Sequence, residues 1–448
     1  MNSPKISFGE KVAFALGDFS NNSAYLFVGT FVISFLTIGM GLSGTAAGTI
    51  IALVTIFDAI NDVIIGSMVD KAHARGTTYT KIMRFSIIPE AVLMVLLFFS
   101  PKFGVGAKVV YAFLIYAIYT IAQTAYQVPY GALSASMTED TDDRIKLGAF
   151  RDWGANVGSL LINTFASVLI LRFGGGEMNT HGFFMSALII GIVLAIGGLI
   201  PTFFCKERVP VVASQEAPFK EGIKSFGHNR PAIVATIVIC MVNCCLMARA
   251  SFTAFYAPYY LGNPELIAPI LSIMSIVPLV AILFIPTLTK LLSRRVMFAI
   301  AGICLILCGI VQAFAGGNLA VCIIGSIFCG LSLCFSITVT WGAIPDIADY
   351  GEYKTGVYCP SVCYAAITFM MKLATAIASY ALGAILDGYG FEAGNVTENA
   401  VSGIHTWYIL IPIILGLIAL VAALFFDLTK NKLDEVQAEL EKIHGEAN

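Results

Sequence analysis

The stretch IALVTIFDAINDVIIGSMVDKAHARG (51–76) is an apolar run that contains Asp58 and Asp62 and then gives way to Asp70 and basic residues. A helix needs about 20 mainly apolar residues to cross the hydrocarbon core of a bilayer. The run reaches that length before Lys71 and Arg75 end it. It therefore predicts a membrane-spanning helix that holds two carboxylates, Asp58 and Asp62, at membrane depth, where ionised groups are costly and usually functional.

The composition of the whole chain is typical of a membrane protein. Of its 448 residues, 58% are hydrophobic and only 12% are charged, and the mean hydropathy is +0.85. Soluble proteins carry about 25% charged residues, because their surface faces water. The net charge of −2 indicates no nucleic-acid partner. The cysteines show no spacing typical of a metal site. We expect a lipid bilayer around most of the surface and no cofactor.

Twelve spans can be read along the chain, and the longest polar stretch between them divides them six and six. The spans are expected near 12–40, 46–69, 82–100, 108–137, 147–172, 183–204, 232–261, 267–290, 296–315, 319–344, 359–387 and 405–427. This predicts an all-α membrane protein built as a transporter of two pseudo-symmetric halves. Its parts are a six-helix bundle (1–205), a cytoplasmic central loop (206–230), a second six-helix bundle (231–428) and a cytoplasmic tail (429–448).

The basic residues predict the orientation, because cytoplasmic segments carry an excess of Lys and Arg. With a cytoplasmic amino terminus, almost all basic residues outside the spans fall on the cytoplasmic side. The exceptions are Lys102, Lys108 and Arg172. Both termini are therefore expected in the cytoplasm of a cell whose membrane, the inner membrane in bacteria with two, holds the chain. In the tail, Asn431–His444 interleaves charged and apolar residues and is expected to form a short amphipathic helix.

The acids of the second span form the first candidate site. Asp58 and Asp62 are four residues apart, so they share one helix face, which Asn61 flanks. Two neighbouring carboxylates repel, and each raises the proton affinity of the other. Na⁺, a proton or Lys372 of the eleventh span could compensate them. The alternative is a static ion-pair network that only fixes helix packing.

A second group of polar residues predicts a sugar site. Asp18 in the first span and Arg151 in the fifth can hold vicinal hydroxyls, because a carboxylate accepts and a guanidinium donates. Thr124 and Gln127 form a further polar cluster in the fourth span, and Tyr256 could pack on an apolar sugar face. The alternatives are a salt bridge without a ligand, hydrogen bonds between helices and an aromatic belt at the outer interface.

Four stretches resemble the glycoside–pentoside–hexuronide:cation symporter family of the major facilitator superfamily, whose best-known type is the melibiose permease. They are Gly17-Asp18-Phe19 followed by Asn21-Asn22, FDAINDVIIGSMVD (57–70), WGAIPDIADYGEYKTG (341–356) and FMMKLATAIASYALGAILDGYGF (369–391), which contains Lys372. The resemblance covers nearly the whole chain and implies a major-facilitator fold of twelve helices.

The resemblance also implies roles for individual residues. The cation site corresponds to Asp58, Asn61, Asp62 and Thr124, and the sugar site to Asp18, Gln127 and Arg151. We add Lys372 and Tyr256 as candidate sugar-binding residues. Lys372 corresponds to a lysine that approaches the cation-site carboxylates and couples the sites. The melibiose permease has an aspartate in place of Gln127, so a different sugar is expected here. The resemblance to the superfamily's cytoplasmic motif implies gates at Asp70 and Arg75 and at Asp346, Asp349 and Glu352.

The sequence thus predicts a secondary active transporter that couples Na⁺ or H⁺ to the symport of a glycoside, pentoside or hexuronide by alternating access. We expect a functional monomer whose small-molecule partners are a sugar and a monovalent cation. Two alternatives are a lipid or amphiphile carrier of the same fold and a membrane sensor that binds a solute without moving it. The sequence shows no nucleophile–base constellation, so we do not expect an enzyme.

Overall fold

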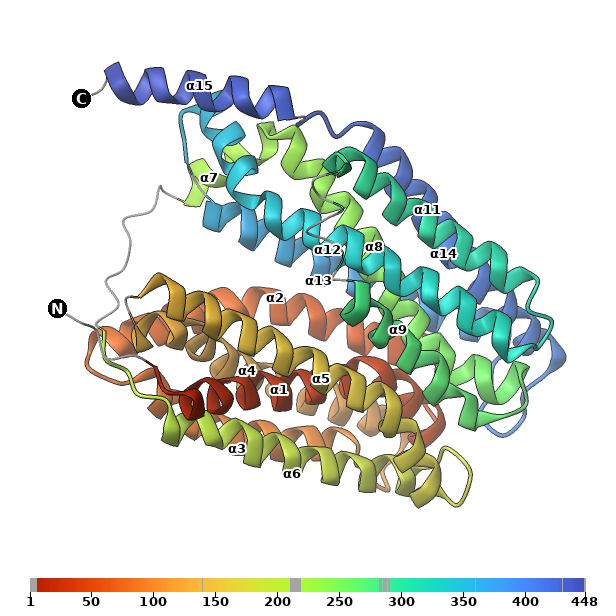
Figure 1. The fold of residues 1–448 in the computed structure, drawn as a ribbon. Helices are drawn as coiled ribbons and strands as arrows, with labels where there is room; N and C mark the ends of the chain where they lie inside the picture. Colours follow the sequence, from red (N-terminus) through yellow and green to blue (C-terminus); the bar gives the residue numbers. More distant parts are fainter. Residues whose placement is uncertain are drawn as a thin grey trace. The chain divides into compact units, whose positions relative to one another are not determined.

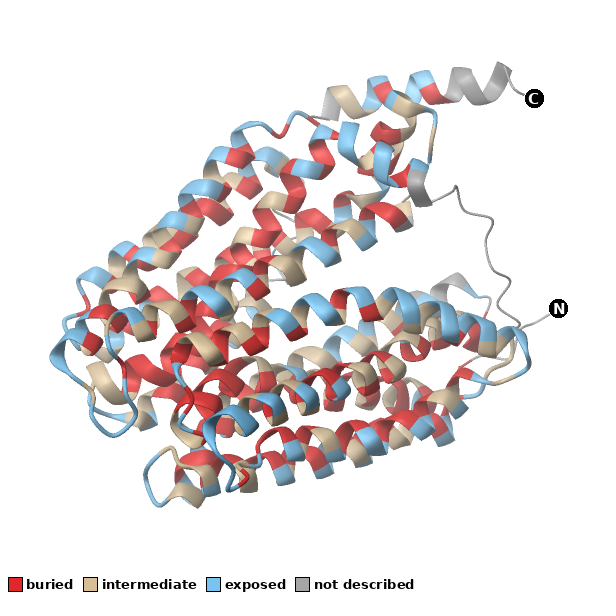
Figure 2. Ribbon diagram, turned by 180° about the vertical axis from the view of Figure 1, so that it is seen from behind, coloured by how far each residue is buried: buried red, intermediate tan, exposed pale blue. Residues whose placement is uncertain are grey.

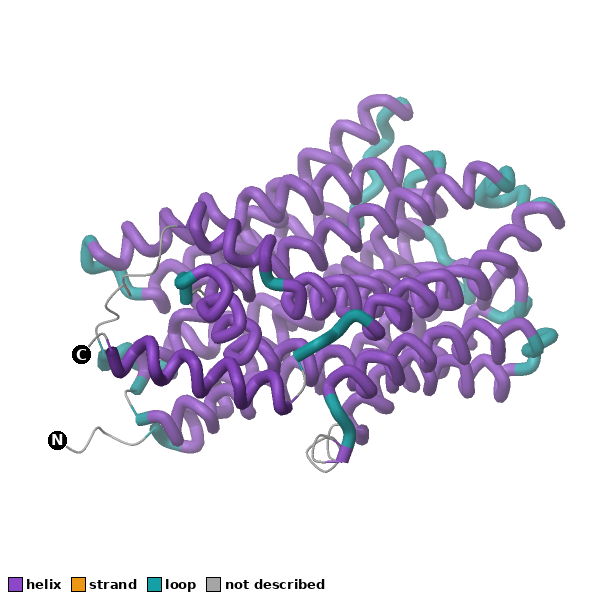
Figure 3. The backbone as a smooth tube through the Cα atoms, turned by 90° about the horizontal axis from the view of Figure 1, so that it is seen from above, coloured by secondary structure: helices purple, strands orange, loops and turns teal. Residues whose placement is uncertain are grey.

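The computed structural model describes residues 6–138, 140–209, 219–281, 284, 288, 291–358, 360–428 and 430–446. In these ranges every regular element is a helix, and none is a strand (Figure 3). Part of the predicted central loop, residues 210–218, lies outside the described residues, as do most residues between 282 and 290 at the end of the predicted eighth span. The predicted all-helical membrane fold is confirmed.

The amino-terminal helices form a bundle in which α1 is flanked by its neighbours (Figure 1). Their bounds are α1 (Phe8–Ser34) with the π-helical turn η1 (Phe35–Gly39), α2 (Gly44–Ala74), α3 (Tyr79–Leu97), α4 (Val105–Met137), α5 (Thr141–Gly174) and α6 (Thr180–Phe204). The start of α1 is fixed by a capping box, in which the Ser7 hydroxyl accepts from the Glu10 amide and the Glu10 carboxylate accepts from the Ser7 amide.

The remaining elements begin within the predicted central loop. They are α7 (Phe219–His228), α8 (Arg230–Phe255), η2 (Tyr256–Tyr260), η3 (Pro264–Leu266), α9 (Ile267–Ala281), α11 (Arg294–Ala313), α12 (Leu319–Thr355), α13 (Pro360–Gly388), α14 (Glu398–Leu424) and α15 (Lys430–Glu446). The helix α7 within the central loop was not predicted from the sequence. The predicted tail helix is present as α15.

Eleven helices of the described residues are long and apolar enough to cross a membrane. The predicted third span, α3, is not among them because its 19 residues include Lys81, Arg84 and Glu90. Figure 2 shows buried and exposed residues alternating around the helices. This is the pattern of helices that pack on one face and meet lipid on another.

The chain divides into two compact units. The first comprises Met1–Ala213, Ala250–Ser275 and Ser379–Ile404, and the second comprises Ser214–Arg249, Ile276–Ala378 and His405–Asn448. The first unit therefore contains the whole of α1 to α6. The predicted division into bundles at 1–205 and 231–428 stays a prediction.

Close contact between α1 and α5 positions the residues of the predicted sugar site. A Cβ atom at Gly154 would lie 2.3 Å from the Ala15 carbonyl oxygen, and one at Gly158 would lie 2.5 Å from the Phe19 oxygen. Only glycine allows the two backbones to approach this closely. The side-chain amide of Asn22 donates to the Ala155 carbonyl oxygen at 2.8 Å and fixes the same crossing.

The start of α2 is held by the end of α13, also within the first unit. The Gly44 and Thr45 amides donate to the Asp387 carboxylate at 2.6 and 2.7 Å, which satisfies two donors at the helix start. A Cβ atom at Gly383 would lie 2.1 Å from the Gly44 oxygen, so glycine is needed here as well. These contacts fix the start of α2, the helix that holds Asp58.

Candidate functional site

The predicted cation-site residues of α2 and α4 lie together. The Thr124 hydroxyl is 2.9 Å from an Asp62 carboxylate oxygen and 3.4 Å from an Asp58 oxygen. One hydroxyl hydrogen can be donated to only one of two acceptors at a time. The two acids therefore share a single neutral donor at Thr124. Such a group of carboxylate and hydroxyl oxygens suits a hard cation such as Na⁺.

Asn61 lies one turn of helix from Asp58 and is 6% exposed. Its amide nitrogen Nδ2 is buried and has no hydrogen-bond partner among the described residues. A buried polar group usually finds a partner, so an unpaired one marks a position where a partner is missing or changes. Among the described residues, no three His, Cys, Asp or Glu side chains gather as a metal site does.

Asp18 and Arg151 meet across the close crossing of α1 and α5. The Arg151 Nε donates to an Asp18 carboxylate oxygen at 3.3 Å. The Asp18 side chain is 10% exposed, whereas that of Arg151 is 41% exposed. The Arg151 guanidinium also lies 5.5 Å from the centre of the Tyr130 ring. The predicted pair is therefore present, with its cation as the more exposed partner.

Tyr130 packs beside this pair and is held in place by contacts with α1. Its hydroxyl donates to the Phe14 carbonyl oxygen at 2.6 Å, and its ring stacks on Phe14 with centroids 4.7 Å apart. A Cβ atom at Gly17 would lie 2.7 Å from the Tyr130 ring, so the ring lies directly against the α1 backbone. The aromatic side chain thus fixes where α4 meets α1 beside Asp18.

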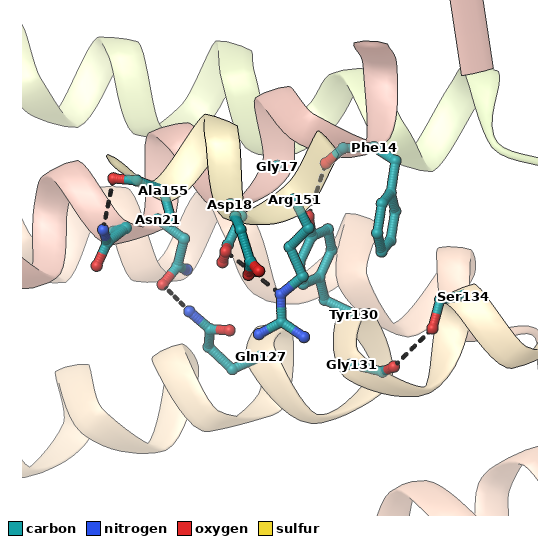
Figure 4. A network of polar contacts seen from close by, with 12 residues as sticks. Phe14, Gly17, Asp18, Asn21, Gln127, Tyr130, Gly131, Ser134, Arg151 and Ala155 are labelled. Carbon is teal, nitrogen blue, oxygen red and sulfur yellow. Dashed lines mark hydrogen bonds and ion pairs between the residues drawn. The ribbon is translucent and has the colours of Figure 1, made fainter. Parts of the chain in front are cut away.

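Gln127 of α4 belongs to the same cluster (Figure 4). Its amide nitrogen donates to the Asn21 side-chain oxygen, and the Asn21 nitrogen in turn donates to a Glu90 carboxylate oxygen at 3.0 Å. Figure 4 shows Gln127 extending from α4 toward α1 beside the Arg151 guanidinium. The amides thereby connect the sugar-site residues to an acid of α3.

Asn21 and Glu90 were not predicted as site residues. Asn21 lay within a quoted motif but was given no role, and Glu90 lay inside a predicted span without being recognised as a charge at membrane depth. That position was the signal that could have found it, because ionisable residues in spans are usually functional. Both side chains are 0% exposed.

Lys372 and Tyr256 stay predictions as site residues. Lys372 belongs to the second unit and is half-buried, whereas the carboxylates that it was predicted to approach belong to the first. Tyr256 belongs to the first unit, is 0% exposed and stacks on Tyr260 with ring centroids 4.9 Å apart.

The predicted gate residues of the first unit are exposed. Asp70 and Arg75 lie at the end of α2, and no ion pair between them occurs among the described residues.

The Glu207 carboxylate accepts from the Tyr79 and Thr80 amides at 3.1 and 2.9 Å and caps α3. Lys11 donates to Asp143 at 2.9 Å, and this contact together with the Ile6 amide lowers the pKa of Asp143.

The predicted gate residues of the second unit have described partners. Asp346 of α12 forms an ion pair with Arg294 at the start of α11. Asp349 accepts a hydrogen bond from Gln437 of α15. Val436 and Leu440 of α15 are buried in the same apolar cluster as Ile347. The tail helix thus packs its apolar face on α12. A gating role for Asp346, Asp349 and Glu352 stays a prediction.

Comparison with protein families finds one match that spans most of the chain. A model of the MFS/sugar transport protein family matches residues 13–430. An uncharacterized symporter, YnaJ, of Bacillus subtilis is 30% identical over 98% of this chain and 96% of its own length.

Two further relatives have names that state a substrate. The isoprimeverose transporter of Lactiplantibacillus pentosus is 27% identical over 99% of this chain and 93% of its own length. The glucuronide carrier protein homolog of Escherichia coli is 28% identical over 98% and 96%. Among solved structures, a D-xylose-proton symporter superposes with a TM-score of 0.65 at 17% identity and covers 94% of this chain and 97% of its own. That likeness concerns the fold alone.

Proposed function

Because this chain belongs to the MFS/sugar transport protein family, we propose that it is a secondary active transporter that moves a sugar with Na⁺ or H⁺ by alternating access. It is a multi-pass membrane protein, and its family and its named relatives are transporters, not enzymes. Coupling to a cation is the part of this proposal that rests on the site.

The observation that carries the proposal is that one helix face serves both predicted sites. Thr124 contacts the acids of α2, and Gln127 contacts the cluster that holds Asp18 and Arg151. These two residues are three positions apart on α4, so their side chains lie on one face about one turn apart. A shift of α4 that improves one site therefore changes the other.

The cation supplies the charge that the α2 acids require. With Asp58 and Asp62 both ionised, their neighbouring charges repel each other, and the Thr124 hydroxyl at 2.9 and 3.4 Å is a neutral partner that adds no positive charge. Na⁺ would coordinate the oxygens of both, and a proton would remove one of the charges. When the site is empty, Lys372 takes this role in the mechanism that we propose, and cation binding releases it.

The sugar site is built from one acid, one base and one amide. Asp18 offers carboxylate oxygens to hydroxyl donors, and Arg151 offers planar N–H donors to hydroxyl oxygens. A pair of neighbouring hydroxyls on a sugar ring presents both functions. Gln127 adds a neutral amide, which can hydrogen-bond a hydroxyl without adding charge.

The substrate that we propose is a glycoside, pentoside or hexuronide. The relatives named for isoprimeverose and for glucuronide provide test compounds of two of these kinds. Coupling is reciprocal in such a carrier, so that the cation tightens sugar binding by the same factor by which the sugar tightens cation binding.

The test is a binding and transport panel on the purified protein. Isoprimeverose, a methyl pentoside and a methyl glucuronide are screened by thermal shift with and without Na⁺ at two pH values. Compounds that stabilise are then assayed for uptake into proteoliposomes under an imposed Na⁺ or pH gradient. We expect one sugar and one cation to enhance each other's binding and to drive accumulation. Binding of a sugar without any cation effect or uptake would contradict the proposal.

A further inference from the structure

The acid of α3 has no role in the sites described so far. Glu90 follows Pro89 within the 19 residues of α3 and is 0% exposed. One carboxylate oxygen accepts from the Asn21 amide at 3.0 Å. The other oxygen is buried and has no hydrogen-bond partner among the described residues. Glu90 is therefore a membrane-embedded acid held by a single neutral donor.

The groups around Glu90 include no described cation that pairs with it. From α1 it meets the neutral Asn21, and Asp18 is the nearest acid along that helix. On α4, which packs on α3, the buried residues Tyr119 and Tyr126 carry no charge. The helix α6 contains no Asp, Glu, Lys or Arg, and its Gly198 carbonyl oxygen accepts a hydrogen bond from the Tyr126 hydroxyl.

Charge considerations favour one form of the acid. An ionised carboxylate at membrane depth without a cation costs several kcal/mol, whereas the neutral acid avoids most of that cost. The surroundings of Glu90 therefore accommodate the carboxylic acid better than the carboxylate.

The contact chain gives that proton a consequence at the sugar site. The Asn21 nitrogen donates to Glu90, so its oxygen is turned toward α4 and accepts from the Gln127 nitrogen. This contact fixes the orientation of the Gln127 amide, because its nitrogen must face the Asn21 oxygen. A charge on Glu90 would strengthen the bond from Asn21 and would also require a donor or water at the second carboxylate oxygen, which has no partner among the described residues, so the packing around Asn21 would change.

We propose that Glu90 is a proton-binding residue of this carrier which, through Asn21, sets the orientation of Gln127 in the sugar site. The proposal rests on the proposed function in so far as it concerns sugar. It makes Glu90 a positioning residue rather than one that contacts the substrate.

The first experiment tests the charge of Glu90 without any sugar. Infrared spectra of the purified full-length protein in proteoliposomes at neutral pH are compared with those of Glu90→Gln. We expect the variant to lose part of the carbonyl band of protonated carboxylic acids. Asp143→Asn is the matched control, because Asp143 is paired with Lys11 and should contribute no such band. An unchanged band in Glu90→Gln overturns the proposal.

The second experiment tests the link to the sugar site. The affinity for isoprimeverose or a methyl glucuronide, whichever binds, is measured across pH in the wild type, Glu90→Gln and Asn21→Leu. We expect the wild-type affinity to fall as pH rises through the titration of Glu90, by at most about tenfold per pH unit for one linked proton. Glu90→Gln should lose this component while keeping the low-pH affinity. Asn21→Leu should lose it while keeping the infrared band.

The outcomes separate the two ideas. A wild-type pH dependence in Glu90→Gln overturns the link even if the infrared band changes. If no sugar binds, the proposed function fails, and the infrared comparison still decides the charge state. Folding is checked by melting of each variant, with Glu90→Leu as a second neutral substitution. Failure of both neutral variants to fold counts against a neutral Glu90.

Discussion

Two polar clusters of the first unit share α4 but differ in their charge balance. The Asp18–Arg151 cluster contains one acid and one base at 3.3 Å, so its charges compensate each other within the protein. The Asp58–Asp62 cluster contains two acids that share the Thr124 hydroxyl. The first cluster combines opposite charges, whereas the second brings two like charges together, which we propose a cation or a proton neutralises.

Because of this difference, the two clusters are suited to different functions. A balanced pair is suited to recognising a neutral polar molecule, because it exchanges one set of hydrogen bonds for another. An unbalanced pair is suited to responding to an ion, because binding removes repulsion. Their connection through α4 is what a coupled carrier requires. Substitutions in one cluster should therefore have effects that differ in kind from substitutions in the other.

The largest effect is expected for Asp58→Asn. Removal of one of the two acids abolishes the repulsion that a cation relieves, so gradient-driven accumulation of sugar in proteoliposomes should be lost. Exchange of sugar across the membrane without a gradient should persist. Asp434→Asn, which changes an exposed acid of α15, is the control and should accumulate sugar normally. Normal accumulation by Asp58→Asn would falsify the cation site.

A smaller but still large effect is expected for Arg151→Lys. The lysine keeps the charge opposite Asp18 but lacks the planar set of donors, so sugar affinity should fall about tenfold or more, the equivalent of one charge-assisted hydrogen bond. Stabilisation by the cation alone should be unchanged in a thermal-shift titration. If cation binding falls in parallel with sugar binding, the two clusters are not separable in the way proposed.

A moderate effect is expected for Thr124→Ala. Loss of the hydroxyl removes one oxygen from the cation site and one donor from the acids, worth about 1 kcal/mol, or roughly fivefold in cation affinity. Thr124→Ser keeps the hydroxyl and should restore most of the affinity. The comparison is made by titrating the cation at fixed sugar concentration. Equal affinities of the alanine and serine variants would exclude a direct role of the hydroxyl.

The smallest effect is expected outside both clusters, at Asp143. Its pKa is lowered in the folded protein by Lys11 and the Ile6 amide. The stability that it contributes is present above the ordinary aspartate pKa of 3.8 and is lost as pH falls through the lower folded value. Asp143→Asn should lower the Tm slightly at neutral pH and not at strongly acid pH. An equal loss at both pH values would contradict this ion-pair contribution.

Several site residues could be predicted because their signals are local. Asp58 and Asp62 share a helix face through their spacing alone, and the apolar run around them indicates membrane depth. The proximity of Thr124 to these acids followed from family resemblance, and the pairing of Asp18 with Arg151 followed from their complementary chemistry as well. The structure places both sets in contact. The approach of Lys372 to the acids is a prediction that these contacts do not test.

Other residues could not be predicted because their significance arises from contacts between helices. Asn21 has the same amide as many asparagines in spans, and only packing places it between Gln127 and Glu90. Gly154 likewise reads as one of 41 glycines. Its role became apparent only when the Ala15 backbone was found where a Cβ atom would stand.

The sequence by itself determined that this chain is a bundle of membrane-spanning helices with two acids on one face of the second span. Hydropathy and helical periodicity depend on neighbouring residues, so they can be read along the chain. The tertiary structure decided which faces meet, because helix packing depends on side-chain shape across distant segments. It thereby placed the Thr124 hydroxyl against both acids and joined Glu90, through Asn21, to the residues of the sugar site.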